Sequence, residues 1–251
     1  MSTPFDLSGR VAVVTGANTG IGQAIALALA AAGADIAAVG RTPAEETAAK
    51  VRSMGRRVEL IAADLGTIEP VERIVAETLA KLGGIDILVN NAGIIRRADS
   101  VDFTEADWDA VVDTNLKSVF FLCQAAGRHM IRQGRGKIIN IASMLTFQGG
   151  IRVPSYTASK AGVGGLTKLL ANEWSAKGVN VNAIAPGYIA TNNTAALQAD
   201  PDRNASIMER IPAGRWGRAE DLGGAAVFLA SSASDYVDGH ILAVDGGWLA
   251  R

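Results

Sequence analysis

The sequence predicts one α/β domain, built as a Rossmann-like doubly wound parallel sheet of seven strands with helices on both faces. Short runs rich in Val, Ile and Ala recur along the chain, and they are apolar at successive positions, as strands covered on both faces require. Longer helical patterns separate these runs, and crossover helices are what join parallel neighbours. The predicted strands are residues 11–15, 35–40, 58–62, 85–90, 137–142, 179–185 and 241–244.

The elements in order fit one domain over residues 1–251. A chain of 251 residues with 49% hydrophobic residues is long enough for one large core and too short for two of the usual size. The first run ends at a glycine-rich turn. A helix is predicted to begin near Ile21, and its clearest helical pattern covers 23–32. Further helices are predicted over 69–82 and 161–176, whereas 191–210, with Asn192-Asn193 and Asp200-Pro201, shows little sustained periodicity and is predicted to be the least regular region.

Charge and composition favour small-molecule chemistry. The net charge of −1 gives no basic footprint for nucleic acid or for an anionic membrane. The first residues lack a basic region followed by an apolar run, and no stretch resembles a membrane span, so we expect a cytoplasmic protein. Cys123 is the only cysteine, which excludes an internal disulfide, and its apolar surroundings predict a buried packing role.

Three other reaction classes lack the residues they need. His129 and His240 are the only histidines, and neither lies among acidic residues and cysteines at metal-ligand spacing, so we predict no metal site. The chain has no Gly-x-Ser-x-Gly segment for a serine hydrolase. The glycine-rich turn lacks the Lys-Ser/Thr pair of a phosphate-binding NTPase loop.

The turn after the first strand indicates a dinucleotide site. Gly16, Gly20 and Gly22 lie between an apolar run and a helix start. Without Cβ atoms, their backbone can approach a pyrophosphate at the positive end of the helix. A glycine cluster alone would be weak evidence, but here the strand before it and the helix after it are both predicted.

A tyrosine and a lysine form a candidate proton-transfer pair. If the segment is helical, Tyr156 and Lys160 share one helix face at positions i and i+4. Action near neutral pH requires the tyrosine pKa of about 10 to fall by roughly 2–3 units, or about 3–4 kcal/mol. A unit charge ~4 Å away at an effective dielectric of ~20 contributes about 4 kcal/mol, which is sufficient. Because the same spacing also occurs in ordinary helix-surface pairs, the neighbouring motifs must decide between the two readings.

These motifs occur in a fixed order along the chain. They are Thr15-Gly16-Ala17-Asn18-Thr19-Gly20-Ile21-Gly22, Asn90-Asn91-Ala92-Gly93, Asn115, Ser143, Tyr156 with Lys160, and Pro186-Gly187 with Thr191. On these residues the chain resembles the short-chain dehydrogenase/reductase family along nearly its whole length. The resemblance implies a hydride transfer between a nicotinamide cofactor and a CH–OH or ketone carbon.

The family resemblance assigns roles to the predicted site. Tyr156 would exchange the proton at the substrate oxygen, Ser143 would hold that oxygen, and Lys160 would contact the ribose and lower the tyrosine pKa. Asn115 would anchor a water that links the lysine to solvent. The implied cofactor contacts are Gly16, Asn18, Thr19, Gly20, Ile21, Gly22, Arg41, Asp64, Leu65, Asn91, Ala92, Gly93, Tyr156, Lys160, Pro186, Gly187, Ile189 and Thr191.

Two cofactor contacts have alternative interpretations. At the end of the second strand, Gly40-Arg41-Thr42 carries no acid to repel a 2′-phosphate, and Arg41 could pair with one, so the local chemistry leans to NADP. The resemblance pulls toward NAD, and Arg41 could instead stack on the adenine. Asp64 resembles an adenine-binding residue, but it could also cap the next helix.

Five segments lie largely outside the general motifs, at residues 91–97, 143–154, 190–194, 210–217 and 245–251. In these segments the chain resembles a branch of the family that acts on deoxy sugar acids such as 2-dehydro-3-deoxy-D-gluconate or 2-deoxy-D-gluconate. Arginine is the natural partner of a carboxylate, and amide side chains suit hydroxyls. The substrate candidates are Arg96, Arg97, Arg152, Gln148, Asn192 and Asn193. In the family, the segment corresponding to 191–210 closes over the substrate, so we expect a mobile lid there.

Other functions remain open from the sequence. The four catalytic residues would equally serve a reductase of another ketone, such as a 3-ketoacyl thioester or a polyol. A non-enzymatic nicotinamide-binding sensor is a third reading, since function belongs to sites rather than folds. The resemblance also predicts a homotetramer, packed through the helix after Tyr156 and the strand 241–244, although the same apolar residues could simply face the sheet.

Overall fold

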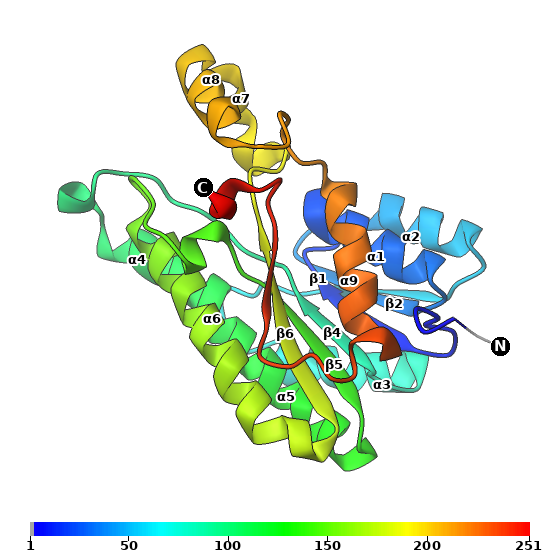
Figure 1. Cartoon of the computed structure of the whole chain (residues 1–251). Helices are drawn as coiled ribbons and strands as arrows, with labels where there is room; N and C mark the ends of the chain where they lie inside the picture. The colour runs from blue at the N-terminus through cyan, green and yellow to red at the C-terminus, as the bar shows by residue number, and fades with distance from the viewer. Residues whose placement is uncertain (1–2) are drawn as a thin grey trace.

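The computed structural model describes residues 3–251 and confirms the predicted fold class (Figure 1). Seven strands form one sheet in the order β3-β2-β1-β4-β5-β6-β7, and every neighbouring pair is parallel. The strands are β1 (Val11–Thr15), β2 (Asp35–Gly40), β3 (Val58–Ala62), β4 (Ile87–Asn90), β5 (Gly136–Ile141), β6 (Val179–Pro186) and β7 (Ile241–Val244). The predicted bounds were therefore correct for β1, β2, β3 and β7 and off by one or two residues at ends of the others.

Helices cover both faces of the sheet, as the apolar character of the strands requires (Figure 1). One face carries α1 (Gly20–Ala31), α2 (Glu45–Ser53) and α9 (Gly223–Ala230). The other carries α3 (Val71–Leu82), α5 (Ser118–Gln133) and α6 (Pro154–Trp174), with α4 (Glu105–Val112) beside α6. Short 3-10 turns join the larger elements at Ser100–Asp102, Met144–Thr146, Ser175–Lys177, Asn192–Thr194, Ala219–Leu222, Ser232–Ser234 and Trp248–Ala250.

Two apolar clusters, one on each face of the sheet, form the core. Successive residues of one strand enter different clusters: Val13 packs under α3 and α5, whereas Val14 packs under α1 and α9. Cys123 is fully buried in the first cluster, as predicted, and burial raises the pKa of its thiol to about 12. A thiol with that pKa stays protonated and unreactive near neutral pH.

The strand order places a binding edge at the carboxyl ends of the strands. After β1 the chain crosses to β2 on one side, and it later returns to β4 on the other side of β1. Loops leaving the carboxyl ends of β1 and β4 therefore diverge and leave a crevice between them, the usual ligand site of open α/β sheets. Thr15 and Asn91, at these two strand ends, are joined directly by a hydrogen bond from the Asn91 backbone N–H to Thr15 Oγ1 at 2.9 Å.

The segment 191–210 is helical, which corrects the expectation of little regular structure there. It contains α7 (Ala195–Ala199) and α8 (Pro201–Arg210), drawn in golden yellow beyond the main body in Figure 1. Asp200 caps α8 by accepting from the backbone N–H groups of Asp202 and Arg203 at 3.1 Å. Asp200-Pro201, taken as a sign of irregularity, is in fact a helix start, because proline is favoured at the first helical position and aspartate just before it.

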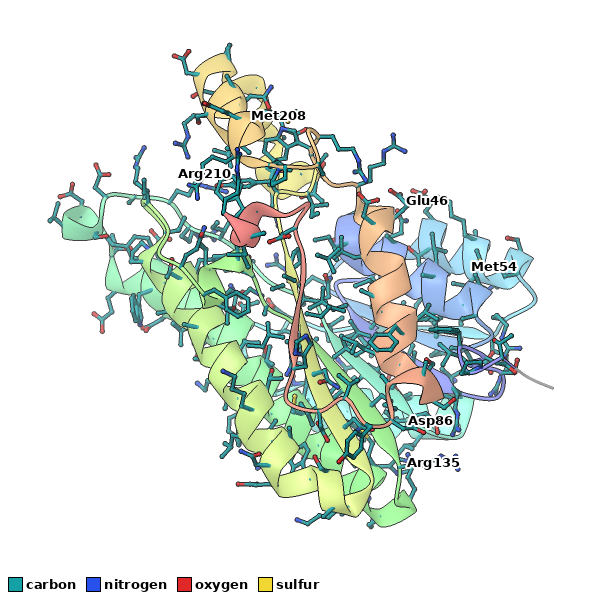
Figure 2. All side chains as sticks on the ribbon, viewed as in Figure 1. Glu46, Met54, Asp86, Arg135, Met208 and Arg210 are labelled. Carbon is teal, nitrogen blue, oxygen red and sulfur yellow. The ribbon has the colours of Figure 1, made fainter. Side chains whose placement is uncertain are left out.

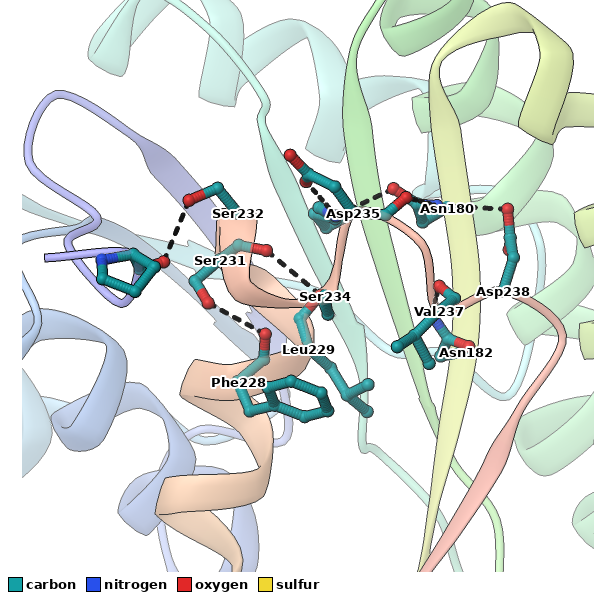
Figure 3. A network of polar contacts seen from close by, with 12 residues as sticks. Asn180, Asn182, Phe228, Leu229, Ser231, Ser232, Ser234, Asp235, Val237 and Asp238 are labelled. Carbon is teal, nitrogen blue, oxygen red and sulfur yellow. Dashed lines mark hydrogen bonds and ion pairs between the residues drawn. The ribbon is translucent and has the colours of Figure 1, made fainter.

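A polar network holds the loop that runs from α9 to the edge strand β7 (Figure 3). Asp238 accepts from the backbone N–H of Val181 at 2.7 Å, and Asn182 donates to the Val237 carbonyl at 2.8 Å. Ser234 completes the preceding turn by donating to the Leu229 carbonyl at 3.1 Å. These bonds hold the loop from α9 against β6, so the last strand enters the sheet in one register.

Within residues 3–251, no helix is both long and apolar enough to cross a membrane.

Candidate active site

The glycine turn is shaped for close approach of a phosphate group. Gly16 and Gly20 have φ of +66° and +57°, which side chains with a Cβ rarely adopt. A Cβ on Gly22 would lie 2.2 Å from the Gly16 carbonyl oxygen, so only glycine fits there. Among the described residues, no side chain caps the start of α1, and its first N–H groups remain available to an anion. The turn therefore fits the pyrophosphate of a dinucleotide.

Asn91 locks this turn to the end of β4. Its side-chain amide donates to the Thr15 carbonyl at 2.9 Å, and Thr15 Oγ1 accepts from the backbone N–H groups of Asn91 and Ala92 at 2.9 Å. A Cβ on Gly16 would meet the Asn91 amide nitrogen at 2.8 Å. The role of the Thr15 hydroxyl was missed from the sequence, because the residue was taken only as the end of a strand.

Asn115 lies in a π-turn, Asp113–Lys117, which joins α4 to α5. Its side chain accepts from the backbone N–H of Ile94 and donates to the Ile94 carbonyl, both at 2.8 Å. A π-turn inserted between helical segments leaves unusual backbone orientations and is frequent at functional sites. The turn holds Asn115, fully buried, against the segment that follows Asn90-Asn91-Ala92-Gly93.

Ser143 and Tyr156 come together from two different elements. Ser143 follows β5, and Tyr156 lies in the first turn of α6, which begins at Pro154, seven residues before the predicted start at 161. Burial raises the pKa of the Tyr156 phenol, whereas its hydrogen bond with Ser143 and the positive charge of Arg97 lower it. In the protein alone, burial prevails and the phenol is held protonated near neutral pH.

Lys160 lies one helical turn beyond Tyr156, as predicted, with its Nζ 5.6 Å from the centre of the tyrosine ring. The ammonium donates to the Ile141 carbonyl at 2.5 Å. Burial lowers the pKa of Lys160 to about 8, because the charged form loses hydration. In the protein alone, the hydrogen bond with Ser143 and the charge of Arg97 lower the pKa of Tyr156, and the expected effect of Lys160 on that pKa stays a prediction.

The adenosine side of the crevice carries exposed polar residues. Arg41 follows β2 and is exposed, and within residues 3–251 it makes no hydrogen bond or ion pair. Asp64 follows β3, and one carboxylate oxygen accepts from the backbone N–H of Gly66 at 2.9 Å, so it caps a local turn rather than a helix. Leu65 beside it is buried. Asn18 and Thr19 lie in the glycine turn, where Asn18 offers its carbonyl to Gln23 at 3.4 Å.

The loop after β6 closes the crevice from the other side. Pro186 ends β6, and a Cβ on Gly187 would meet the Asp245 Cα at 2.6 Å, which requires glycine at this contact. Ile189 is buried beneath the loop. Thr191 lies against the glycine turn, since its Cγ2 would be 3.5 Å from a Cβ on Gly20. The glycine turn after β1 and the loop after β6 therefore lie against each other, although they are far apart in the sequence.

The three candidate arginines differ in their surroundings. Arg96 pairs with Asp107 at 3.1 Å, and Arg152 pairs with Asp99 at 3.0 Å. Arg97 has no carboxylate partner among the described residues; it donates to the Asn193 carbonyl at 3.2 Å and is the arginine whose charge reaches Tyr156. Of the three, Arg97 is thus the arginine whose charge reaches the Tyr156 phenol and that has no carboxylate partner within residues 3–251.

The amide candidates lie on two segments that are far apart in the sequence. Asn192 and Asn193 form the turn Asn192–Thr194, which starts the segment containing α7 and α8. Gln148 follows Ser143 by one short turn and accepts a hydrogen bond from Trp248 Nε1 at 3.3 Å. Trp248 was missed as a site residue, because nothing in its local sequence places the carboxyl-terminal segment near the crevice.

Cavity size does not locate this site. A cavity of about 570 Å³ lies at the amino-terminal edge of the sheet, far from Tyr156 and lined partly by Asp86 and Arg135, which are labelled low in Figure 2. Its main charged groups are paired with one another: Arg10 and Arg135 both pair with Asp86, at 3.2 and 3.0 Å, and Lys137 pairs with Asp235 at 2.8 Å. The carboxyl-terminal edge, where the nucleotide-shaped turn and the titratable groups converge, has the chemistry that the other edge lacks.

The comparisons with known proteins agree with this geometry. A family model described as "Enoyl-(Acyl carrier protein) reductase" matches residues 16–249. The 2-dehydro-3-deoxy-D-gluconate 5-dehydrogenase of Escherichia coli (strain K12) is 60% identical over 248 residues, which cover 98% of this chain and 98% of that protein.

Two solved structures are similar over nearly their whole length. One, from Agrobacterium tumefaciens, is described as a putative 2-deoxy-D-gluconate 3-dehydrogenase with bound NADP; it has a TM-score of 0.94, 60% identity, and coverage of 99% of this chain and 100% of that one. The other, from Beutenbergia cavernae, is described as a putative NAD(P) dependent gluconate 5-dehydrogenase with bound NADP; its TM-score is 0.95 at 51% identity, with coverage of 99% and 100%.

Proposed function

Because this chain belongs to the short-chain dehydrogenase/reductase family, we propose that it is an NAD(P)-dependent dehydrogenase that interconverts a CH–OH group and a ketone on a deoxy sugar acid. The observation that carries the substrate class is Arg97, an arginine without a carboxylate partner among residues 3–251 whose charge reaches the Tyr156 phenol. Three named relatives at 58–60% identity act on 2-dehydro-3-deoxy-D-gluconate by their description, which favours a sugar acid over a 3-ketoacyl thioester or a simple polyol.

The site residues would share the proton chemistry. When bound, the nicotinamide supplies or accepts the hydride at the reacting carbon. Tyr156 delivers the matching proton to the substrate oxygen during reduction and removes it during oxidation, while Ser143 donates a hydrogen bond to that oxygen. The raised pKa of the isolated phenol suits the donor role, and oxidation requires positive charge nearby to make the phenolate accessible.

Lys160 and Asn115 would provide the way out for the proton. Lys160 has a pKa of about 8, so near neutral pH it is charged but can release its proton at modest cost. The hydrogen bond to the Ile141 carbonyl fixes the Lys160 ammonium beside the Tyr156 ring, 5.6 Å from the ring centre. The side-chain amide of Asn115 hydrogen-bonds to both the N–H and the carbonyl of Ile94, which fixes the backbone that follows Asn90-Asn91-Ala92-Gly93.

Arg41 would bind the 2′-phosphate that distinguishes NADP from NAD. The similar proteins from Agrobacterium tumefaciens and Beutenbergia cavernae hold NADP, and this chain has an exposed, uncommitted arginine where a 2′-phosphate would lie. Replacing Arg41 by Asp should shift the ratio of kcat/KM for NADP over NAD toward NAD by about 10–100-fold, as exchange of a charged contact implies. Steady-state kinetics with both cofactors measure this ratio. An unchanged ratio of kcat/KM for NADP over NAD would exclude an ion pair between Arg41 and the 2′-phosphate.

The substrate carboxylate would be held by Arg97, and the three arginines provide matched variants. Replacing Arg97 by Ala should raise KM for the sugar acid by about 10–100-fold, the loss expected for a hydrogen-bonded charge pair. Replacing Arg96 or Arg152, which are paired to Asp107 and Asp99, should change it by less than about threefold.

An uncharged ketone supplies the control for this experiment. Its turnover by the Arg97→Ala variant should match wild type, because no carboxylate is present to lose a partner. Equal losses on both substrates would point to damage of the pocket, and no loss on either would remove the physical reason for a sugar-acid substrate.

The protein would assemble as a homotetramer through α6 and β7. Leu170 and Trp174 of α6 pack into the core, which matches the alternative that this stripe faces the sheet. Leu169 on the same helix remains 46% exposed, and β7 is an edge strand with one unpaired side. Light scattering should give four times the 26.0 kDa chain mass at micromolar concentration. A monomer mass would contradict the assembly.

A further inference from the structure

A third apolar cluster joins the lid segment to the carboxyl end of the chain, apart from the two clusters that flank the sheet. Ile207 and Ile211 supply it from α8 and just beyond, Met144 from the turn after Ser143, and Trp248 from the last residues of the chain. All four are buried, and Trp248 is only 4% exposed. The lid therefore does not rest directly on the sheet core, and its packing depends on Trp248.

On the lid side, Trp248 holds α8 through its ring. The Arg210 guanidinium lies 4.0 Å from the ring centre, and in Figure 2 Arg210 is labelled beside the carboxyl-terminal segment. A cation at that distance over an indole face is attracted by the ring quadrupole. Tyr188 packs edge-on against the same indole at 4.8 Å, which fixes the ring from the side of the loop after β6.

On the pocket side, the same tryptophan fixes the orientation of Gln148. Trp248 Nε1 lies 3.3 Å from Gln148 Oε1. An indole N–H can only donate, so it must face the carbonyl oxygen of the carboxamide. Gln148 Nε2 has no acceptor within residues 3–251, and its two N–H groups are left for another partner.

We propose that Trp248 is a positioning residue that links the packing of the lid to the orientation of Gln148. It holds α8 on one side and the carboxamide of Gln148 on the other, and so presents the Gln148 N–H₂ to substrate oxygens when the lid is packed against the carboxyl-terminal segment. The kinetic part rests on the proposed function, because it assumes that Gln148 donates to the sugar acid. The lid part does not depend on any substrate.

The lid arm is tested by amide hydrogen exchange of α8 in the full-length protein. Replacing Arg210 by Gln should speed exchange in α8 about 3-fold to 30-fold, as loss of a cation–π contact implies. Arg203→Gln is the matched control, since Arg203 lies on the same helix and is exposed without a contact to Trp248. Exchange in β4 should not change in either variant. Equal α8 exchange in Arg210→Gln and wild type would overturn the link to the lid.

The pocket arm is tested by a double-mutant cycle on KM for the sugar acid. Trp248→Phe keeps the ring and removes the N–H donor, and it should raise KM about 2-fold to 10-fold with little change in kcat, because a neutral hydrogen bond is lost. Gln148→Ala should raise KM at least as much. If Trp248 acts through Gln148, the double variant should equal Gln148→Ala alone.

Trp216→Phe is the control for the cycle, because the Trp216 N–H donates to Asn204 Oδ1 at 2.7 Å inside the lid and does not contact Gln148. It should leave KM within about twofold of wild type. Independent, additive losses from Trp248→Phe and Gln148→Ala would overturn the proposed coupling. If wild type turned over no sugar acid while α8 exchange responded as expected, the proposed substrate would fail and the lid part would stand.

Discussion

Replacing Tyr156 by Phe is expected to lower kcat by about 10³-fold or more, because only the phenolic oxygen that exchanges a proton with the substrate is removed. The ring keeps its half-buried position at the start of α6, so the fold and the affinity for NADP should be retained. Stopped-time assays give kcat, and fluorescence titration with NADPH gives the cofactor Kd. Tyr236→Phe, at a fully exposed tyrosine, is the matched control and should behave as wild type. Near-normal turnover by Tyr156→Phe would contradict the assigned role.

Replacing Lys160 by Met should lower kcat/KM about 10²–10³-fold, because the variant loses the ammonium that would carry the proton away from Tyr156, and a positioned proton-transfer group contributes about 10²–10⁴-fold. Methionine keeps much of the side-chain volume and removes the ammonium. Lys168→Met, on the exposed side of the same helix, is the control and should leave kcat/KM unchanged. A loss equal in both variants would show that α6 is being disturbed rather than a proton path.

The Lys160→Met variant should also have a larger free energy of unfolding than wild type near pH 7. Burial lowers the pKa of Lys160 to about 8 from the ordinary value of 10.5, so burying the charged form costs stability at every pH below about 8. Between these two pKa values the unfolded chain binds more protons than the folded one, and the stability of wild type rises with pH. The difference between Lys160→Met and wild type should therefore be about 1–2 kcal/mol at pH 7, after the lost bond to the Ile141 carbonyl is subtracted, and shrink toward pH 10. Urea unfolding at several pH values measures it.

The sheet could be predicted because its signal is local. Runs such as Val11–Thr15 are apolar on both faces, and only a covered parallel strand accounts for them. The proton-transfer pair was predictable for the same reason, since helical periodicity alone brings Tyr156 and Lys160 to one face.

The rest depended on contacts between distant parts of the chain. The difference between Arg97 and the paired Arg96 and Arg152 arises from where Asp107 and Asp99 lie in space, which spacing along the sequence does not encode. Trp248 reaches Gln148 across 100 positions. The helix α8 was missed for another reason, because Asp200-Pro201 marks both turns and helix starts and was given the first meaning.

The substrate class is the central claim, and a panel of initial rates tests it most directly. The purified full-length protein would be given deoxy sugar acids such as 2-dehydro-3-deoxy-D-gluconate, uncharged polyols or ketones, and a 3-ketoacyl thioester, each with NAD(H) and NADP(H). We expect kcat/KM for a deoxy sugar acid to exceed that for every uncharged compound by at least about 10-fold, because an arginine pairs with its carboxylate. A thioester or an uncharged ketone turned over better than every sugar acid would contradict the account.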